Sequence, residues 1–206
     1  MKLQSIEKMK ELKPEFVRAS AIFGKNMVLL FRVDKDVLLD NHHHPHIQFG
    51  YCFNGSFDFN VDGSRTIVEK GMSYIIDADV PHSAVALTDY YSMDLKYITA
   101  DGQMDERVAY DVMEAADEKE EVYSVNKYRA AGKTIIQIDV KETQAELKLN
   151  LMPEKKYCLL SGSVTGFKAA GDSFELEPMK IYVLKGEAEL ELQIERKGTT
   201  LFLVEV

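Results

Sequence analysis

The sequence predicts an all-β protein built from short antiparallel strands arranged as a sandwich or barrel. Apolar and polar residues alternate with the period of a strand, most clearly at Phe57, Phe59 and Val61, which have polar residues between them. Turn-forming Gly, Pro and Asp separate the apolar segments, and the two halves of the chain repeat a similar order of segments. With 206 residues, the chain has room for two β domains of about 100 residues each.

The first half begins with a predicted helix. Apolar residues recur about every three positions from Leu3 to Leu12, a spacing that favours a short amphipathic helix ending before Pro14. Residues 34–41 are expected to form a loop or a sheet edge, and Asp62-Gly63 signals a hairpin turn. The remaining expected strands are residues 27–33, 53–61, 66–68, 72–76, 82–87 and 92–98.

The composition changes near residue 100. Acidic residues dominate 101–121, where Val108, Val112 and Met113 have loose helical spacing, so a connecting helix with a solvated acidic face is expected there. Strands resume near Lys133, and the expected ones are residues 134–140, 145–151, 157–160, 181–184, 188–194 and 200–206.

Composition also limits the classes of function. The net charge of −9 argues against nucleic acids and anionic membranes as partners, since both are bound by basic surfaces. The charged N-terminal segment lacks the apolar run of a signal peptide, and no apolar stretch reaches the roughly 18 residues of a membrane span. Cys52 and Cys158, one in each half, do not suggest a disulfide framework. A cytoplasmic location is therefore expected.

All five histidines belong to one constellation, because four lie within five residues and the fifth is His82. Neutral imidazole is the commonest metal ligand in proteins. Alternate side chains of a strand share a face, so His42, His44 and Gln48 can point the same way, and His82 can close the site from another strand. The alternative is a fortuitous histidine-rich loop, with His82 capping a turn after Pro81.

The other two histidines have different expected places. His43 has the opposite parity on the strand and is expected to be an exposed bystander. His46 has the right parity but follows Pro45, where the chain can kink. It is therefore expected beside the ligands rather than among them.

The spacing of these residues resembles the two motifs of the cupin family, G-x5-H-x-H-x3,4-E-x6-G and G-x5-P-x-G-x2-H-x3-N. His42-x-His44-x3-Gln48-x6-Gly55 follows the first motif, with Gln in the Glu position. Residues 71–82 have the spacing of the second motif from its leading Gly to its His. The resemblance implies a double-stranded β-helix, or jelly roll.

The resemblance covers about residues 25–100 and includes departures from the family pattern. Four motif positions carry another residue, namely Asp36, Asp77, Asp79 and Ala86 in place of Gly, Pro, Gly and Asn. These departures alter the turn residues but leave the ligand positions filled. The ligands that the resemblance implies for one divalent transition metal (Zn, Fe, Ni, Co or Mn) are His42, His44, Gln48 and His82.

The second half lacks such a ligand set. When the halves are aligned on Gly162, the ligand positions are occupied by residues unsuited to a metal, namely Leu149, Leu151, Lys155 and Leu190. The resemblance therefore implies a bicupin. Its expected parts are a metal-binding barrel at 1–100, an acidic connecting segment at 101–130 and a degenerate, metal-free barrel at 131–206.

Gln48 bears on the chemistry, since three imidazoles and a neutral carboxamide leave the metal with its full charge. This favours a Lewis-acid role over redox cycling. Residues 42–50 resemble the H-x-H-P-H-x-Q-x-G pattern of cupins that act on sugar acids and keto acids, such as the pectin-degradation ring-opening cupin and the bacilysin-pathway isomerase. The resemblance implies isomerisation, cyclisation or ring-opening of a small polar metabolite such as a keto acid or uronate. An oxygenase on the same site and a non-catalytic module that binds or senses a small molecule are the alternatives.

A general acid or base is expected beside the metal. The candidates are His46, Tyr51 and Tyr74, with Arg65 as a further one. Each has a structural alternative, because the tyrosines can be core or rim aromatics and Arg65 can be a turn residue. The family resemblance also implies a homodimer.

Overall fold

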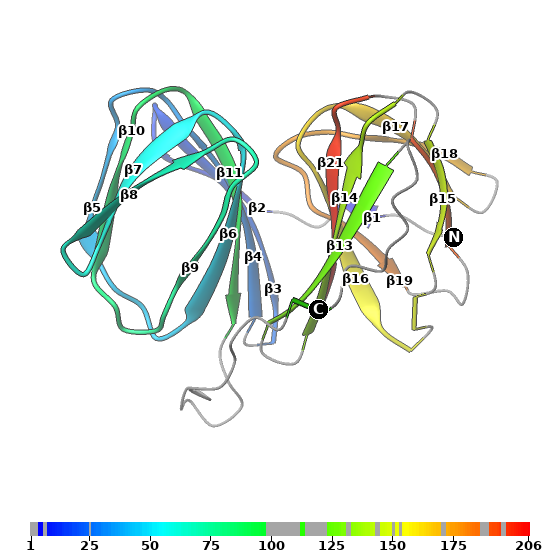
Figure 1. Cartoon of the computed structure of the whole chain (residues 1–206), viewed down its shortest axis with the longest axis horizontal. Coiled ribbons are helices and arrows are strands. Elements are labelled where there is room, and N and C mark those ends of the chain that lie inside the picture. The colour runs from blue at the N-terminus through cyan, green and yellow to red at the C-terminus, as the bar shows by residue number, and fades with distance from the viewer. Residues whose placement is uncertain are drawn as a thin grey trace. The chain divides into compact units, whose positions relative to one another are not determined.

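The computed structural model describes residues 4–5, 8–24, 26–97, 112–113, 123–130, 133–142, 145–149, 151–152, 154–169, 172–185, 190–194 and 197–206. Every regular element in these residues is a β-strand. The chain divides into two compact units, Glu7–Val108 and a unit made of Met1–Ile6 with Ala109–Val206 (Figure 1). They are called the first and second barrel.

The first barrel consists of two antiparallel sheets (Figure 1). The larger sheet has the strand order β2 (Lys8–Lys13), β3 (Phe16–Phe23), β4 (Asn26–Val33), β11 (Tyr90–Tyr97), β6 (Ile47–Asn54) and β9 (Ser73–Ile76). The smaller sheet has the order β5 (Leu38–His42), β10 (His82–Ala86), β7 (Ser56–Val61) and β8 (Ser64–Glu69).

The second barrel also consists of two antiparallel sheets. The larger sheet has the order β1 (Gln4–Ser5), β19 (Tyr182–Lys185), β16 (Lys156–Ser161), β21 (Thr200–Glu205), β14 (Lys133–Val140), β13 (Tyr123–Ala130) and β12 (Val112–Met113). The smaller sheet has the order β15 (Ala145–Leu149), β20 (Leu190–Ile194), β17 (Thr165–Ala169) and β18 (Asp172–Leu176).

The two barrels share one strand order. The order β2-β3-β4-β11-β6-β9 in the larger sheet of the first barrel recurs as β12-β13-β14-β21-β16-β19 in that of the second barrel, which has β1 as an additional edge strand. The order β5-β10-β7-β8 recurs as β15-β20-β17-β18. Both units therefore have the arrangement of a double-stranded β-helix, and the predicted fold class is confirmed.

The predicted N-terminal helix is wrong. Residues 4–5 and 8–13 form β1 and β2, and β2 pairs with β3 from Lys8 opposite Ser20 to Lys13 opposite Phe16. Pro14, interpreted as the end of a helix, instead opens the two-residue turn between these strands. A helix this short is marginal on its own, whereas the edge of the sheet offers a ladder of backbone hydrogen bonds.

The predicted connecting helix falls mostly outside the described residues. The part that is described, Val112–Met113, is not helical but forms β12, which pairs with β13. Strand β13, which the sequence assigned to the connecting segment, pairs along its whole length with β14. It thus belongs to the larger sheet of the second barrel.

The period-two pattern of the first half sets which side chains face the barrel interior. On β6, Gln48 and Cys52 face inward, whereas Tyr51 and Phe53 pack against each other on the other face. The Asp62-Gly63 hairpin turn forms as predicted, with φ angles of 48° and 81°.

No described segment is a helix long and apolar enough to cross a membrane. The interior core cluster of this barrel is Phe16, Val33, Cys52, Phe57, Phe59, Val68, Ile76, Ala84, Ala86 and Tyr90.

Candidate metal centre

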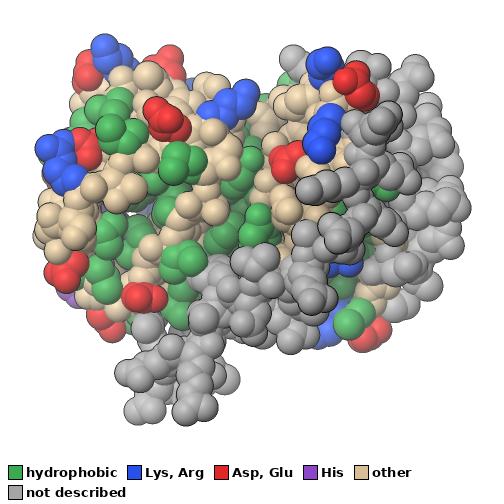
Figure 2. Space-filling view, in the orientation of Figure 1, with side chains coloured by type: hydrophobic (Ala, Val, Ile, Leu, Met, Phe, Trp, Pro, Cys, Tyr) green, Lys and Arg blue, Asp and Glu red, His purple; other side chains and the backbone are tan. Residues whose placement is uncertain are grey.

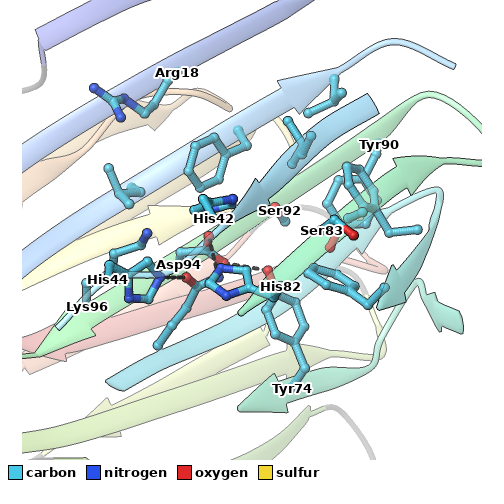
Figure 3. Close-up of a pocket in the computed structure, with 18 of the residues that line it drawn as sticks. Arg18, His42, His44, Tyr74, His82, Ser83, Tyr90, Ser92, Asp94 and Lys96 are labelled. Carbon is cyan, nitrogen blue, oxygen red and sulfur yellow. Dashed lines mark hydrogen bonds between the residues drawn. The ribbon is translucent and has the colours of Figure 1, made fainter. Parts of the chain in front are cut away.

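Three histidines converge at the end of the smaller sheet of the first barrel. His42 is the last residue of β5 and His82 the first of β10, and the two are direct cross-strand partners. His44 follows β5, and one ring nitrogen of each histidine lies within 4.8 Å of those of the other two (Figure 3). The Asp79 N–H donates to the His44 carbonyl (2.9 Å), which holds this turn against the segment before β10.

The protein orients each of the three rings with a backbone hydrogen bond. His42 Nδ1 donates to the Asp40 carbonyl (2.8 Å), His44 Nδ1 to the His46 carbonyl (3.0 Å) and His82 Nδ1 to the Val80 carbonyl (2.8 Å). A ring that donates through Nδ1 and is neutral has its lone pair on Nε2. The three rings thereby carry their free lone pairs on the nitrogen available to a metal.

Burial favours the neutral form of two of these imidazoles, His44 and His82. The pKa of His44 falls from 6.5 to about 4, first because burial disfavours the charged ring and second because the Lys96 charge lies nearby. Burial likewise lowers the pKa of His82. Neutral imidazole is the form that binds metals.

Gln48 supplies an oxygen from the facing sheet. Its amide nitrogen donates to Asp94 Oδ2 (2.9 Å), which directs its Oε1 at His44 Nε2, 2.8 Å away. With the His44 proton on Nδ1, both of these facing atoms are acceptors, and such contact is unfavourable unless a cation joins them. Two ligand atoms that bind one metal ion at right angles, each through a bond of about 2.1 Å, lie about 3 Å apart. The observed distance of 2.8 Å between His44 Nε2 and Gln48 Oε1 is close to this value. The donor set thus fits a divalent metal.

Asp94 connects Gln48 to Tyr74. The buried carboxylate accepts the Gln48 amide on one oxygen and the Tyr74 hydroxyl on the other (2.5 Å). Burial raises the pKa of Asp94 from 3.8 to about 6, although the Lys96 charge and both hydrogen bonds lower it in part. Burial and the Asp94 charge raise the pKa of Tyr74 well above 10.0, so Tyr74 keeps its proton.

Gly50 makes room for the Tyr74–Asp94 contact. Gly50 lies on β6 with Tyr74 of β9 opposite it on one side and Asp94 of β11 opposite it on the other. A Cβ atom at Gly50 would fall inside the Tyr74 ring. Only glycine therefore lets the ring cross β6 and reach the carboxylate.

The histidines open on a cavity of about 400 Å³. Most of its wall is apolar and comes from β3, β4, β5 and β7, whereas its polar groups come from the histidine cluster and from β3, β6, β9, β10 and β11. The lining residues are Phe16, Arg18, Met27, Leu29, Phe31, Val33, Leu39, His42, His44, His46, Gln48, Phe57, Phe59, Tyr74, His82, Ser83, Ala84, Tyr90, Ser92, Asp94 and Lys96. A volume of this size suits a small molecule.

The four predicted metal ligands lie together at one end of this cavity, and two of the acid or base candidates line it. Tyr74 joins the site through Asp94, and the His46 ring stacks on His44 with centroids 5.6 Å apart. The buried His46 Nδ1 has no hydrogen-bond partner among the described residues.

Three other sequence candidates lie away from the cavity. Tyr51 is on the outer face of β6, where it packs on Phe53 with ring centroids 5.4 Å apart. The reason is parity, because Tyr51 is an odd number of residues from Gln48. Arg65 is exposed and paired with Asp58, and His43 is exposed as expected.

Sequence reasoning missed several polar residues of the cavity, among them Arg18, Ser92, Asp94 and Lys96. A signal for three of them existed, because Ser92, Asp94 and Lys96 place polar groups at every second position of an otherwise apolar strand. Arg18 carried no comparable signal, since its strand was not among those expected.

Comparison with known proteins identifies the family. Residues 30–94 match the family model of the cupin domain. This part of the first barrel is therefore a cupin domain. No curated protein matches the chain at a significant level.

Solved structures share the cupin fold over nearly the whole chain. AerE from Microcystis aeruginosa matches with 14% identity and a TM-score of 0.68, covering 98% of each chain. A cupin 2 conserved barrel domain protein from Leptotrichia buccalis matches with 13% identity and a TM-score of 0.63, over 96% of this chain and 91% of the other. Quercetin 2,3-dioxygenase from Acinetobacter baumannii matches with 11% identity and a TM-score of 0.70, over 98% and 78%. At these identities the matches show the fold alone.

Two departures from the cupin motifs are conservative in backbone geometry. Asp36 and Asp79 occupy motif positions of glycine and have φ angles of 65° and 58°. Aspartate tolerates this left-handed region better than most residues. The chain therefore keeps a left-handed backbone at these two motif positions without a glycine there.

Proposed function

We propose that this protein is a metal-dependent bicupin enzyme that converts a small oxygen-rich metabolite, with one divalent transition metal in the first barrel. The observation that carries the proposal is the convergence of three imidazoles with the Gln48 oxygen. The metal would be held by His42, His44, His82 and Gln48. The reaction class proposed is isomerisation, cyclisation or ring-opening of a keto acid, uronate or related compound.

The ligand set supports a Lewis-acid reaction. When bound, a metal in this neutral set would keep its full charge and polarise a carbonyl or stabilise an enolate oxygen. Asp94 holds the Gln48 amide so that its oxygen faces the histidines, which makes Asp94 a positioning group. The largely apolar wall lowers the local dielectric, which strengthens the electrostatic interactions inside the cavity.

The chain also offers two proton carriers at the cavity. Tyr74 lines the cavity and its hydroxyl donates to Asp94 through a 2.5 Å hydrogen bond. His46 lines the cavity beside His44 and has one buried ring nitrogen without a partner among the described residues. We propose that one of the two exchanges a proton with the substrate, since enolate chemistry needs such a group.

The test combines metal analysis with turnover. The purified full chain should contain about one equivalent of a divalent metal by inductively coupled plasma mass spectrometry, and should convert a member of a keto acid and uronate panel without oxygen. Asp94→Asn should keep the metal and lower the turnover.

Other outcomes would favour the alternative functions. Consumption of O₂ by the iron-loaded protein during turnover would replace the proposal with an oxygenase. Metal-dependent ligand binding without turnover of any panel member would favour a binding or sensing module.

A further inference from the structure

The cavity contains two cationic side chains that the metal site does not use. Arg18 comes from β3 and Lys96 from β11, and both line the same cavity as the histidines. Figure 3 shows Lys96 near His44 and Arg18 farther along the wall, and the Lys96 charge is close enough to lower the pKa of His44. The cavity thus has a positive region beside the candidate metal.

Neither cation forms an ion pair within the described part of the chain, although the Asp94 charge acts on Lys96. No ion pair there includes Arg18 or Lys96, and the buried Arg18 Nε has no hydrogen-bond acceptor. Asp94 is the one carboxylate among the lining residues, and its oxygens are occupied by Tyr74 and Gln48. The positive groups of the cavity therefore outnumber its negative ones.

The excess of positive charge in the cavity is opposite in sign to the net charge of the whole chain, which is −9. On the face shown in Figure 2, acidic and basic side chains are interspersed over the first barrel. Burial lowers the pKa of Lys96, and although Asp94 opposes this shift, the Arg18 charge lowers the pKa further. Placing cations in a partly desolvated cavity is costly unless an anion joins them.

We propose that Arg18 and Lys96 form an anion subsite that binds the carboxylate of the substrate, while a second oxygen of the same molecule reaches the histidines. Apolar side chains such as Leu29, Phe31 and Phe59 line the same cavity and would contact the carbon body. Within the proposed substrates, this selects a monocarboxylic acid with an apolar body and a carbonyl or hydroxyl oxygen, that is, a keto or hydroxy acid rather than a uronate. This inference rests on the proposed metal-dependent function.

The probes are 4-methyl-2-oxopentanoate and its uncharged amide, with dissociation constants measured by calorimetry on the metal-loaded full chain. A charge-assisted hydrogen bond predicts that the acid binds about tenfold to a hundredfold more tightly than the amide. Arg18→Gln and Lys96→Gln should each reduce this preference, and the double variant should abolish it. Arg18→Lys should retain part of it, because it keeps the charge.

The matched control is Arg32→Gln. Arg32 is on the neighbouring strand β4 but is exposed and has the opposite parity to the lining residues Leu29 and Phe31, so its replacement should leave the preference unchanged. Circular dichroism and the metal content of each variant show that the fold and the metal site persist.

Equal binding of acid and amide to the wild type, binding of neither, or a preference that survives the double variant would overturn the subsite. A preference for the acid that depends on Arg18 and Lys96 in a chain that binds no metal would support the subsite and contradict the proposed function. A metal-loaded chain without the preference would leave the metal centre in place and remove only the subsite.

Discussion

The two barrels place different residues at the same positions of one topology. In the first barrel His42 of β5 is the cross-strand partner of His82 of β10. In the second barrel Leu149 of β15 is the partner of Leu190 of β20, which are the corresponding strands. The positions that present imidazoles to a cavity in one barrel thus carry leucines in the other, and buried Leu149 belongs to the apolar core.

A second pair of corresponding positions also carries different residues in the two barrels. Asp94 lies opposite Gly50 in the first barrel, and Glu205 lies opposite Tyr157 in the second. Asp94 accepts the Gln48 amide, whereas Glu205 accepts the Lys155 ammonium at 2.8 Å. Burial alone would raise the pKa of Glu205, but the hydrogen bond and charge of Lys155 lower it overall.

The comparison shows how one fold serves two purposes. At the position of Gly50, whose missing side chain lets Tyr74 cross the strand, the second barrel has Tyr157, which is 3% exposed within the core. At these positions the second barrel has an ion pair and apolar core residues, whereas the first has the side chains that line its cavity. Stability and chemistry are therefore expected to respond to different mutations.

The largest effect is expected from removing a metal ligand. His82→Ala should lower the affinity for a divalent metal about 1,000-fold, because each of four ligands carries about a quarter of the binding free energy. Competition with a chromophoric chelator measures this affinity. The control is His43→Ala, which removes an exposed histidine of the same cluster and should leave the affinity unchanged. Equal losses in both variants would contradict the assignment.

The corresponding position of the second barrel should respond in stability instead. Leu149→Ala should lower the free energy of unfolding by about 3 kcal/mol through loss of buried contacts and the cavity left behind. It should not change the metal content. Urea unfolding followed by circular dichroism measures the effect, with Met152→Ala, at a residue 56% exposed, as the near-neutral control.

A smaller effect is expected at the crossing of Tyr74 over β6. Gly50→Ala should displace the Tyr74 ring and break its hydrogen bond to Asp94, at a cost of about 1–3 kcal/mol in unfolding free energy. Adding Tyr74→Ala should bring less than an additive loss, since the second change relieves the clash. Additive losses would show that the ring does not depend on Gly50.

The smallest effect concerns the pH dependence of the metal-free protein. Burial lowers the pKa of His44 from 6.5 to about 4, so the unfolded state binds more protons and the free energy of unfolding falls as the pH drops through this range. Burial raises the pKa of Asp94 from 3.8 to about 6, which has the opposite sign, because the folded state then binds more protons. The two contributions should offset each other in part.

Asp94→Asn removes the second contribution. The variant should lose about 2 kcal/mol more stability than the wild type between pH 6.5 and pH 4.5, measured by urea unfolding with a chelator present. An unchanged or shallower slope would show that Asp94 ionises normally in the folded protein.

The sequence predicted well those features that depend on local periodicity. The alternation of apolar residues located β4, β7, β8, β9, β10 and β11 within a few residues, and the parity of His42, His44 and Gln48 is consistent with their shared position at the cavity. It failed at the N-terminus, where spacing near three residues was interpreted as a helix and edge pairing with β3 produced a strand. Local spacing alone does not include the pairing partner.

By itself, then, the sequence determined an all-β chain with one cluster of candidate metal ligands and a second half without one. Only the tertiary structure decided that Asp94 holds Gln48, that Tyr74 crosses Gly50, and that Arg18 reaches the same cavity as Lys96. The physical reason is that periodicity assigns a side chain to a face of its strand. Which faces then meet depends on strand register and on the closure of the two sheets, and both join residues far apart in the chain.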